Sequence, residues 1–254
     1  MMEKLVSIAS EEEHVEQTEL QPRQEAPITK HERDPLDPFQ QGTKDDLVLP
    51  FRALVQGVSR KADVSKAGQF WDELTDTYKP EMLVSLIALR RTRTLFNRVN
   101  FTDPPVCSSN DAITPRERVQ FKGEQTGPTC EECSFSQWGS GEGQGQACDF
   151  QYNLICYDLD DQETFILRVG GASRGSWKKY LTAGQRQGIP GYAVATTIGS
   201  EARTFTKGAA HVLTFKGGVM LPEETILEMR GLAAQFQGVD LGVPEVEVEE
   251  LPFE

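Results

Sequence analysis

Short stretches rich in apolar and β-branched residues recur through the middle of the chain, separated by turn residues and polar loops. Several of them alternate apolar with polar positions, which is typical of strands that bury one face. The pattern predicts strands over residues 47–56, 82–91 continuing into 92–99, 150–158, 164–169, 192–198 and 210–215. Acidic turn residues between 158 and 164 make the third and fourth of these a hairpin.

Boundary residues indicate two helices. Ser173 or Ser176 is suited to cap a helix with Trp177 on its apolar face, and Gly188 is suited to end it. Pro222, followed by two acids, is suited to open a last helix. The elements together predict a mainly β (α+β) fold. Its core is an oligonucleotide-binding (OB)-like five-stranded barrel with an insertion, one internal helix and one C-terminal helix.

The two ends of the chain differ in composition from its middle. Residues 1–45 are polar and acidic, which predicts a disordered N-terminal arm. Residues 46–237 are expected to form the folded domain, and residues 238–254 an acidic tail. No apolar run approaches the roughly 18 residues that cross a bilayer, and the acidic start is unlike a signal peptide. We therefore expect no membrane partner and a cytoplasmic location.

The net charge of −13 argues at first against a nucleic-acid partner, but the acids are concentrated at the ends. Residues 1–46 carry a net charge of −7 and residues 221–254 a net charge of −8, which leaves +2 for the segment between them. Because clustered cations lie in that segment, its surface is suited to a polyanion.

Four cysteines, Cys107, Cys130, Cys133 and Cys148, are spaced as C-x22-C-x2-C-x14-C. A C-x2-C pair places two thiolates on one tight turn, and two more from flanking segments complete a tetrahedral shell for structural Zn²⁺. The segment that holds them, about 101–149, is too polar and Gly-rich to bury a core of its own. Metal binding would therefore supply its folding energy, and the spacing predicts a zinc-stapled insertion.

Two alternatives to a zinc site stay open. The thiols can be free or buried, as is expected for Cys156 within an apolar strand. Disulfides fit least, because the number of cysteines is odd and no secretory segment precedes them.

Cationic and aromatic residues gather in two places. The first set is Arg91, Arg93, Phe96 and Arg98, in which Arg91 and Arg93 share one face of a strand. Cations that follow phosphates, with aromatic faces for the bases, are typical of sequence-tolerant binding to single strands. The alternative is a solvated strand face with Phe96 in the core.

The second set is Arg174, Lys178 and Lys179 on the internal helix. There the neighbouring Trp177 is expected in the core, which leaves only the cations as contacts. This set also points to a nucleic-acid surface.

Trp138 lies within the cysteine insertion. Its ring can stack on a base, or it can cover the metal site as part of a small core. The sequence leaves both roles open.

No residue set typical of an enzyme is evident. Asp158, Asp160 and Asp161 can chelate a hard cation, as in a metal-dependent nuclease, but a hairpin turn favours Asp at the same positions. His211 stands alone in a strand, without the partners of a nucleophile. We therefore expect a binding protein, not an enzyme.

The chain ends in an acidic run with an apolar hook. Residues Glu249, Glu250, Leu251, Pro252 and Phe253 resemble the acidic tips of bacterial single-stranded DNA-binding proteins, although Glu254 follows the Phe here. The resemblance implies that these residues recruit replication or recombination proteins. Such a tail can also occupy a basic groove, or serve only solubility.

The body is similar to a family of uncharacterised proteins from phages and mobile elements. The likeness covers about residues 47–216, and the block of cysteines and Trp138 is its most specific part. It implies a setting in phage DNA replication or recombination. We therefore expect a non-enzymatic, sequence-tolerant single-stranded DNA-binding protein with one structural zinc, for which a homo-oligomer is possible. The second hypothesis is a zinc-containing adaptor in a phage replication or transcription complex, whose main ligand is protein.

Overall fold

The computed structural model divides the chain into two units, residues 1–47 and 48–254. It describes residues 49–59, 61–97, 104–141, 144–206 and 208–237, all of which belong to the second unit. The predicted arm (1–45) and acidic tail (238–254) lie outside the described residues, as does Arg98.

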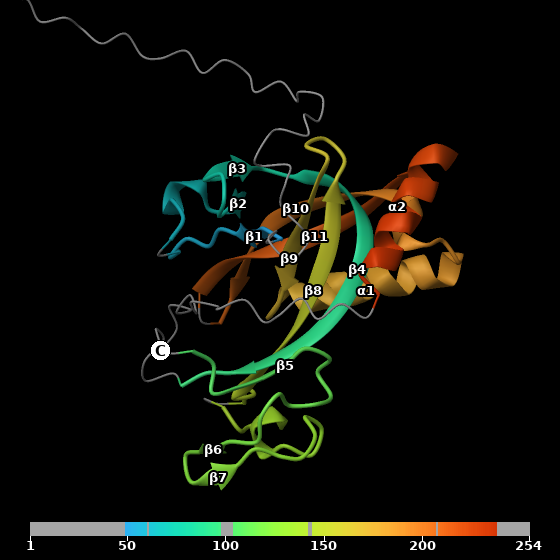
Figure 1. Cartoon of the computed structure of the whole chain (residues 1–254). Coiled ribbons are helices and arrows are strands. Elements are labelled where there is room, and N and C mark those ends of the chain that lie inside the picture. Colours follow the sequence, from blue (N-terminus) through green and yellow to red (C-terminus); the bar gives the residue numbers. More distant parts are fainter. Residues whose placement is uncertain (1–48, 60, 98–103, 142–143, 207, 238–254) are drawn as a thin grey trace, which may run out of the picture. The chain divides into compact units, whose positions relative to one another are not determined.

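The described part is mainly β with two helices, which confirms this level of the predicted fold class (Figure 1). The strands are β1 (Phe51–Leu54), β2 (Phe70–Asp72), β3 (Thr77–Lys79), β4 (Met82–Leu95), β5 (Cys107–Ser109), β6 (Gln120–Phe121), β7 (Glu124–Gln125), β8 (Cys148–Asp158), β9 (Glu163–Val169), β10 (Val194–Phe205) and β11 (Gly208–Met220). The helices are α1 (Ser173–Gln187) and α2 (Glu223–Gln235), with short 3-10 turns η3 (Val64–Lys66), η4 (Ser134–Ser136) and η5 (Gly191–Ala193).

One curled sheet of nine strands organises the described part (Figure 1). Its order is β11-β10-β4-β8-β9-β1-β2-β3, and β5 pairs with β4 off this path. The strands β4, β8 and β9 form an antiparallel meander, and β1 joins β9 in parallel. The long β4 pairs with β10 at its beginning and with β5 at its end.

The sheet differs from the predicted five-stranded barrel in strand number and in closure. The short strands β2, β3 and β5 fall where loops were expected, and among the described strands no pairing joins β11 to β3. The predicted strands over 82–99, 150–158 and 164–169 correspond to β4, β8 and β9. The described strands therefore do not confirm the OB-like five-stranded barrel.

The ends of α1 follow local rules only in part. Gly188 closes the helix in the left-handed conformation with φ of 66°, as expected of a residue without Cβ. No side chain caps its beginning. The Ser173 hydroxyl instead accepts a hydrogen bond from the Leu213 amide at 3.0 Å and so ties α1 to β11.

The two helices pack against opposite faces of the sheet. Trp177 of α1 is 3% exposed and packs in a cluster with Leu154, whereas Met229 of α2 packs with Ile155. Successive strand residues point to opposite faces, so Leu154 and Ile155 serve different layers. Complete burial of each such side chain stabilises the fold by about 1.5–3 kcal/mol. No helix in the described ranges is long and apolar enough to cross a membrane.

Candidate functional site

The four cysteines of the insertion line one pocket. Cys107 lies in β5 and Cys148 begins β8, and both stand opposite Leu95 of β4 in the pairing register. Cys130 and Cys133 lie in the loop that leads into η4. Three separate segments of the chain therefore bring four thiols to the end of β4.

Close backbone packing builds the loop that carries the central pair. A Cβ at Gly127 would lie 2.7 Å from both the Cα and the amide nitrogen of Cys133, so only glycine fits there. The Cys130 amide donates to the Ile113 carbonyl at 2.8 Å, and the Ser136 hydroxyl donates to the Cys133 carbonyl at 2.9 Å. The polypeptide thus holds the two thiols in place through the backbone.

A small apolar cluster supports the pocket. Phe135 is 7% exposed and packs with Cys133, Cys148 and Leu95. Its ring meets Phe121 edge-on, with 5.5 Å between the ring centroids. These two rings supply the packing that a small metal module needs.

Burial raises the pKa of the Cys107, Cys130 and Cys148 thiols. The pKa of Cys107 rises to about 11, first through burial and then through repulsion by Cys130 and Cys133. The pKa of Cys148 rises to about 12 through burial, which the charge of Arg93 opposes. That of Cys130 is also raised, again with burial as the largest cause. Such a pocket favours neutral thiols unless a cation offsets the thiolate charges.

The pocket is not a closed coordination shell. Among the described residues, no three or more Cys, His, Asp or Glu side chains stand ready to hold a metal ion. The Cys107 thiol, for example, donates to the Glu117 carbonyl at 3.7 Å. Which segments meet at a pocket depends on the backbone, whereas a thiol turns by rotation about one side-chain bond. Rotation of the side chains can therefore turn the four thiols toward one point in the pocket, and four thiols are a donor set that fits Zn²⁺.

The two arginines expected to act together on β4 stand in different surroundings. Arg91 is exposed. Arg93 is half-buried, with its guanidinium carbon 5.3 Å from the centroid of the Phe150 ring. Its Nη1 is buried and has no hydrogen-bond partner among the described residues.

Phe150 also contacts the second cationic set. Arg174 of α1 donates from Nη1 to the Phe150 carbonyl at 3.4 Å, and Lys178 follows one helical turn later and is exposed, as is Lys179. The half-buried Phe150 therefore lies between cations of β4 and of α1. Sequence analysis missed this residue, because its place depends on the register that sets it opposite Arg93.

Trp138 lies outside the apolar cluster of the insertion. Its side chain is 73% exposed, so it does not cover the cysteines. The turn that carries it is held by hydrogen bonds from the Gly139 amide to the Gly145 carbonyl at 2.9 Å and from the Ser140 hydroxyl to the Phe135 carbonyl at 2.8 Å. An exposed Trp on an ordered turn is suited to contact a ligand.

The remaining residues of the predicted nucleic-acid surface are placed differently or lie outside the described part. Phe96 is only 8% exposed, and a ring so buried packs in the core. The structure does not describe Arg98 or the tail residues 249–253.

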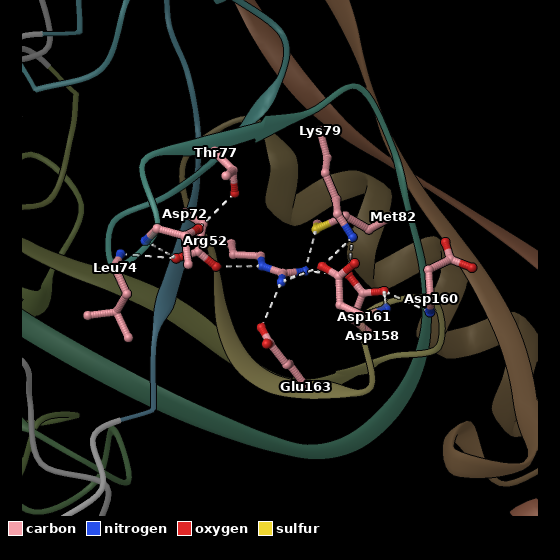
Figure 2. A network of polar contacts seen from close by, with 11 residues as sticks. Arg52, Asp72, Leu74, Thr77, Lys79, Met82, Asp158, Asp160, Asp161 and Glu163 are labelled. Carbon is pink, nitrogen blue, oxygen red and sulfur yellow. Dashed lines mark hydrogen bonds and ion pairs between the residues drawn. The ribbon is translucent and has the colours of Figure 1, made fainter. Parts of the chain in front are cut away.

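The three aspartates considered for a nuclease belong to a polar network around Arg52 (Figure 2). Asp158 is fully buried; one of its oxygens contacts Arg52 and Lys79, and the other accepts the amides of Asp160 and Asp161. Burial raises the pKa of Asp158, but hydrogen bonds from Lys79, the Asp161 amide and Arg52 outweigh it and hold this pKa below its ordinary value. A carboxylate so occupied with cations is unavailable to a catalytic metal ion.

The same network joins segments that are far apart in sequence. Arg52 of β1 donates from Nε to Asp72 of β2 at 3.0 Å and from Nη2 to Asp161 at 3.1 Å. Figure 2 shows these acids converging on the guanidinium group from the β2 and β8–β9 sides. The network therefore holds β1 against the β8–β9 turn, and sequence analysis did not predict it.

Comparison with known proteins adds no relative. No family model matches the chain, and neither the curated proteins nor the solved structures searched contain a match. The resemblance to phage and mobile-element proteins therefore stays a prediction.

Proposed function

We propose that this protein binds single-stranded DNA with little sequence preference, and that one structural Zn²⁺ holds its insertion in place. The observation that supports the DNA-binding surface best is the position of Phe150 between cations of β4 and α1. Phe150 links two segments that lie more than 80 residues apart in sequence, around Arg91 and Arg174, and in this proposal their cations act as one surface. Cations beside an aromatic ring are what binding to an unpaired strand requires.

The charge distribution supports a polyanion as ligand. The segment 47–220, which includes this surface, carries a net charge of +2 although the whole chain carries −13. Arg91, Lys178 and Lys179 are exposed and can each neutralise a phosphate. Binding of this kind weakens steeply with salt, with a slope that grows by about 0.7 for each phosphate contact to a single strand.

Zinc in the cysteine pocket would stabilise the insertion beside this surface. Four thiols from three segments line the pocket. Burial raises the pKa of Cys107 and Cys148, which makes ionisation of these two thiols costly without a cation. Structural zinc offsets that cost by binding the thiolates, so its binding energy becomes folding energy.

We place this activity in DNA replication or recombination of a phage or mobile element, in the bacterial cytoplasm. The curled sheet serves in this proposal as the OB-like platform, and residues 249–253 recruit partner proteins. The acids of the tail compete with DNA for the cationic surface.

The test compares binding of one purified protein to single-stranded DNA, duplex DNA and RNA over a range of salt concentrations. We expect single-stranded DNA to bind better than duplex. The double variant Arg91→Glu with Lys178→Glu should weaken binding to every sequence and reduce the salt slope. The matched control, Lys66→Glu with Arg203→Glu, changes the net charge equally at exposed positions of η3 and β10. Equal losses in both double variants would refute a defined surface.

A second candidate is the zinc-containing adaptor, and the surroundings of Trp138 favour it. Glu131 and Glu132 are exposed, and the Gln137 side-chain amide, next to Trp138 in sequence, donates to the Glu131 carbonyl at 2.7 Å. Acids near an exposed Trp disfavour phosphates and suit a basic protein surface. If the protein binds none of the three nucleic acids at low salt, the adaptor becomes the better proposal.

A further inference from the structure

The unpartnered nitrogen of Arg93 points to a group that the described chain alone does not supply. Nη1 is buried and lacks a hydrogen-bond partner among the described residues, although the side chain as a whole is half-buried. A buried charged donor without an acceptor is costly, so native proteins rarely keep one. Its position indicates what the acceptor is.

Arg93 lies at the cysteine pocket. In the sheet it stands opposite Ser109 on one side and Phe150 on the other. Two residues further along the same face, Leu95 stands opposite Cys107 and Cys148 and lines the pocket with all four cysteines. Burial raises the pKa of both Cys130 and Cys148, and the charge of Arg93 opposes that rise, as expected of a cation on the strand face that leads to the pocket.

A metal ion bound by four thiolates needs an outer cation. Zn²⁺ with four Cys thiolates carries a net charge of −2, and a buried pocket disfavours this charge. Donors in the outer shell hydrogen-bond to first-shell ligands and tune their affinity for the metal. Arg is the suitable cation, because it stays charged and presents several N–H groups in fixed directions.

We propose that Arg93 is a positioning residue of the metal centre, and that its buried Nη1 donates to the cysteine thiolates of the bound ion. The proposal rests on the zinc part of the proposed function. It assigns Arg93, which contacts Phe150, to the metal centre, and leaves the exposed Arg91, Lys178 and Lys179 as the phosphate contacts. It also separates Arg91 from Arg93: the exposed Arg91 contacts DNA, whereas Arg93 stabilises the insertion. The Phe150 ring makes a cation–π contact with the Arg93 guanidinium and so helps to hold it in place.

The experiment uses the full chain and three variants, Arg93→Ala, Arg93→Lys and Arg91→Ala. Zinc content of the unmodified protein is measured first, followed by zinc affinity in competition with a chromophoric chelator. We expect Arg93→Ala to weaken zinc binding by about 10–100-fold, the range for lost outer-shell partners. Arg93→Lys should recover part of the loss, because it keeps the charge but not the planar donor. Arg91→Ala should leave zinc affinity unchanged and weaken binding to single-stranded DNA.

Substitution of Co²⁺ for Zn²⁺ gives an absorption spectrum that would not change if Arg93 only supported the fold. A hydrogen bond lowers the energy of the sulfur lone pairs, so its loss in Arg93→Ala should move the thiolate-to-cobalt charge-transfer band to longer wavelength. If Arg93→Ala fails to fold, the band of Arg93→Lys is measured instead. Arg91→Ala is the matched control on the same face of the same strand and should leave the band unchanged.

The outcomes separate the proposals. Zinc affinity and cobalt spectrum unchanged in Arg93→Ala would overturn the role of Arg93 while leaving the zinc site intact. Loss of DNA binding in Arg93→Ala with unchanged zinc affinity would overturn it too and return Arg93 to the nucleic-acid surface. An unmodified protein without zinc would refute the metal centre as a whole. A protein that holds zinc but binds no DNA would refute only the DNA-binding proposal.

Discussion

Replacing Arg52 with Ala should destabilise the fold far more than replacing an exposed arginine. Arg52 is 4% exposed and contacts Asp72, Asp158 and Asp161, and its guanidinium carbon lies 4.3 Å from the centroid of the Phe165 ring. Arg52→Ala removes the cation and leaves its acidic partners behind. Asp158 is 0% exposed, so water cannot replace the lost contacts without opening the core.

The magnitude follows from this burial. Removing one partner from a buried ion pair costs about 3–5 kcal/mol, because a buried charge is left uncompensated. Lys79 still donates to Asp158 at 2.9 Å, which places the expected cost near the lower end of that range. The control is Arg203→Ala, whose partner Glu201 is also exposed; a surface pair of this kind contributes about 0–1 kcal/mol.

The stability of both variants is measured by urea unfolding, followed by circular dichroism. With an unchanged slope m, the shift of the midpoint gives the change in the free energy of unfolding. Acid unfolding gives an independent reading. The pKa of Asp158 is held below its ordinary value in the folded state, so this group stabilises the fold at neutral pH and the stability is lost as pH falls through the folded-state pKa. Loss of Arg52 raises that pKa and should move acid unfolding to higher pH. A cost for Arg52→Ala no larger than that for Arg203→Ala, with the acid midpoint unchanged, would refute this account.

Three further predictions concern the insertion and the tail. Gly127→Ala should disrupt the cysteine loop, since its Cβ would lie 2.7 Å from the Cys133 backbone; zinc content and proteolysis of the insertion measure this, and a variant with full zinc content would contradict it. Trp138→Ala should change stability by less than about 0.5 kcal/mol because the side chain is 73% exposed; if Trp138 stacks on bases, the same variant weakens single-stranded DNA binding, and unchanged affinity argues for a protein ligand. Deleting residues 245–254 removes five acids and no base; fluorescence anisotropy should show tighter DNA binding, whereas Phe253→Ala should weaken only partner capture, and unchanged affinity after truncation would remove the competition proposed for the tail.

Local chemistry was sufficient for the elements whose boundaries depend on near neighbours. Gly188 ends α1 because a left-handed residue is needed there, and Pro222 precedes α2 because it suits the beginning of a helix. The acidic turn between β8 and β9 was predicted for the same reason. The interactions that set these helix ends and this turn involve residues that are close together in the chain, so they can be predicted from the sequence alone.

The cysteine spacing indicated a shared site, but the sequence could not tell which cations serve it. Arg91 and Arg93 were predicted as a pair, because a strand places both on one face. Their surroundings differ because β5 pairs with β4 only from Arg93 onward, and Cys107 and Cys148 stand opposite the residue two positions further along that strand, whereas β8 pairs alongside both arginines. Strand partners and their register depend on contacts between distant segments, which local propensity does not encode.

The tertiary structure alone decided the site at Phe150 and the network of Arg52. Phe150 joins two cationic sets because register places it opposite Arg93 and packing of α1 brings Arg174 to its carbonyl. Arg52 finds Asp158 over a separation of 106 residues because β1 adds to the meander in parallel beside β9. The sequence therefore determined the kind of the longer elements, helix or strand, and which charged, thiol and aromatic side chains are present. The tertiary structure decided which of these side chains come into contact. The physical reason is that burying a charge is favourable only where an oppositely charged partner is in place.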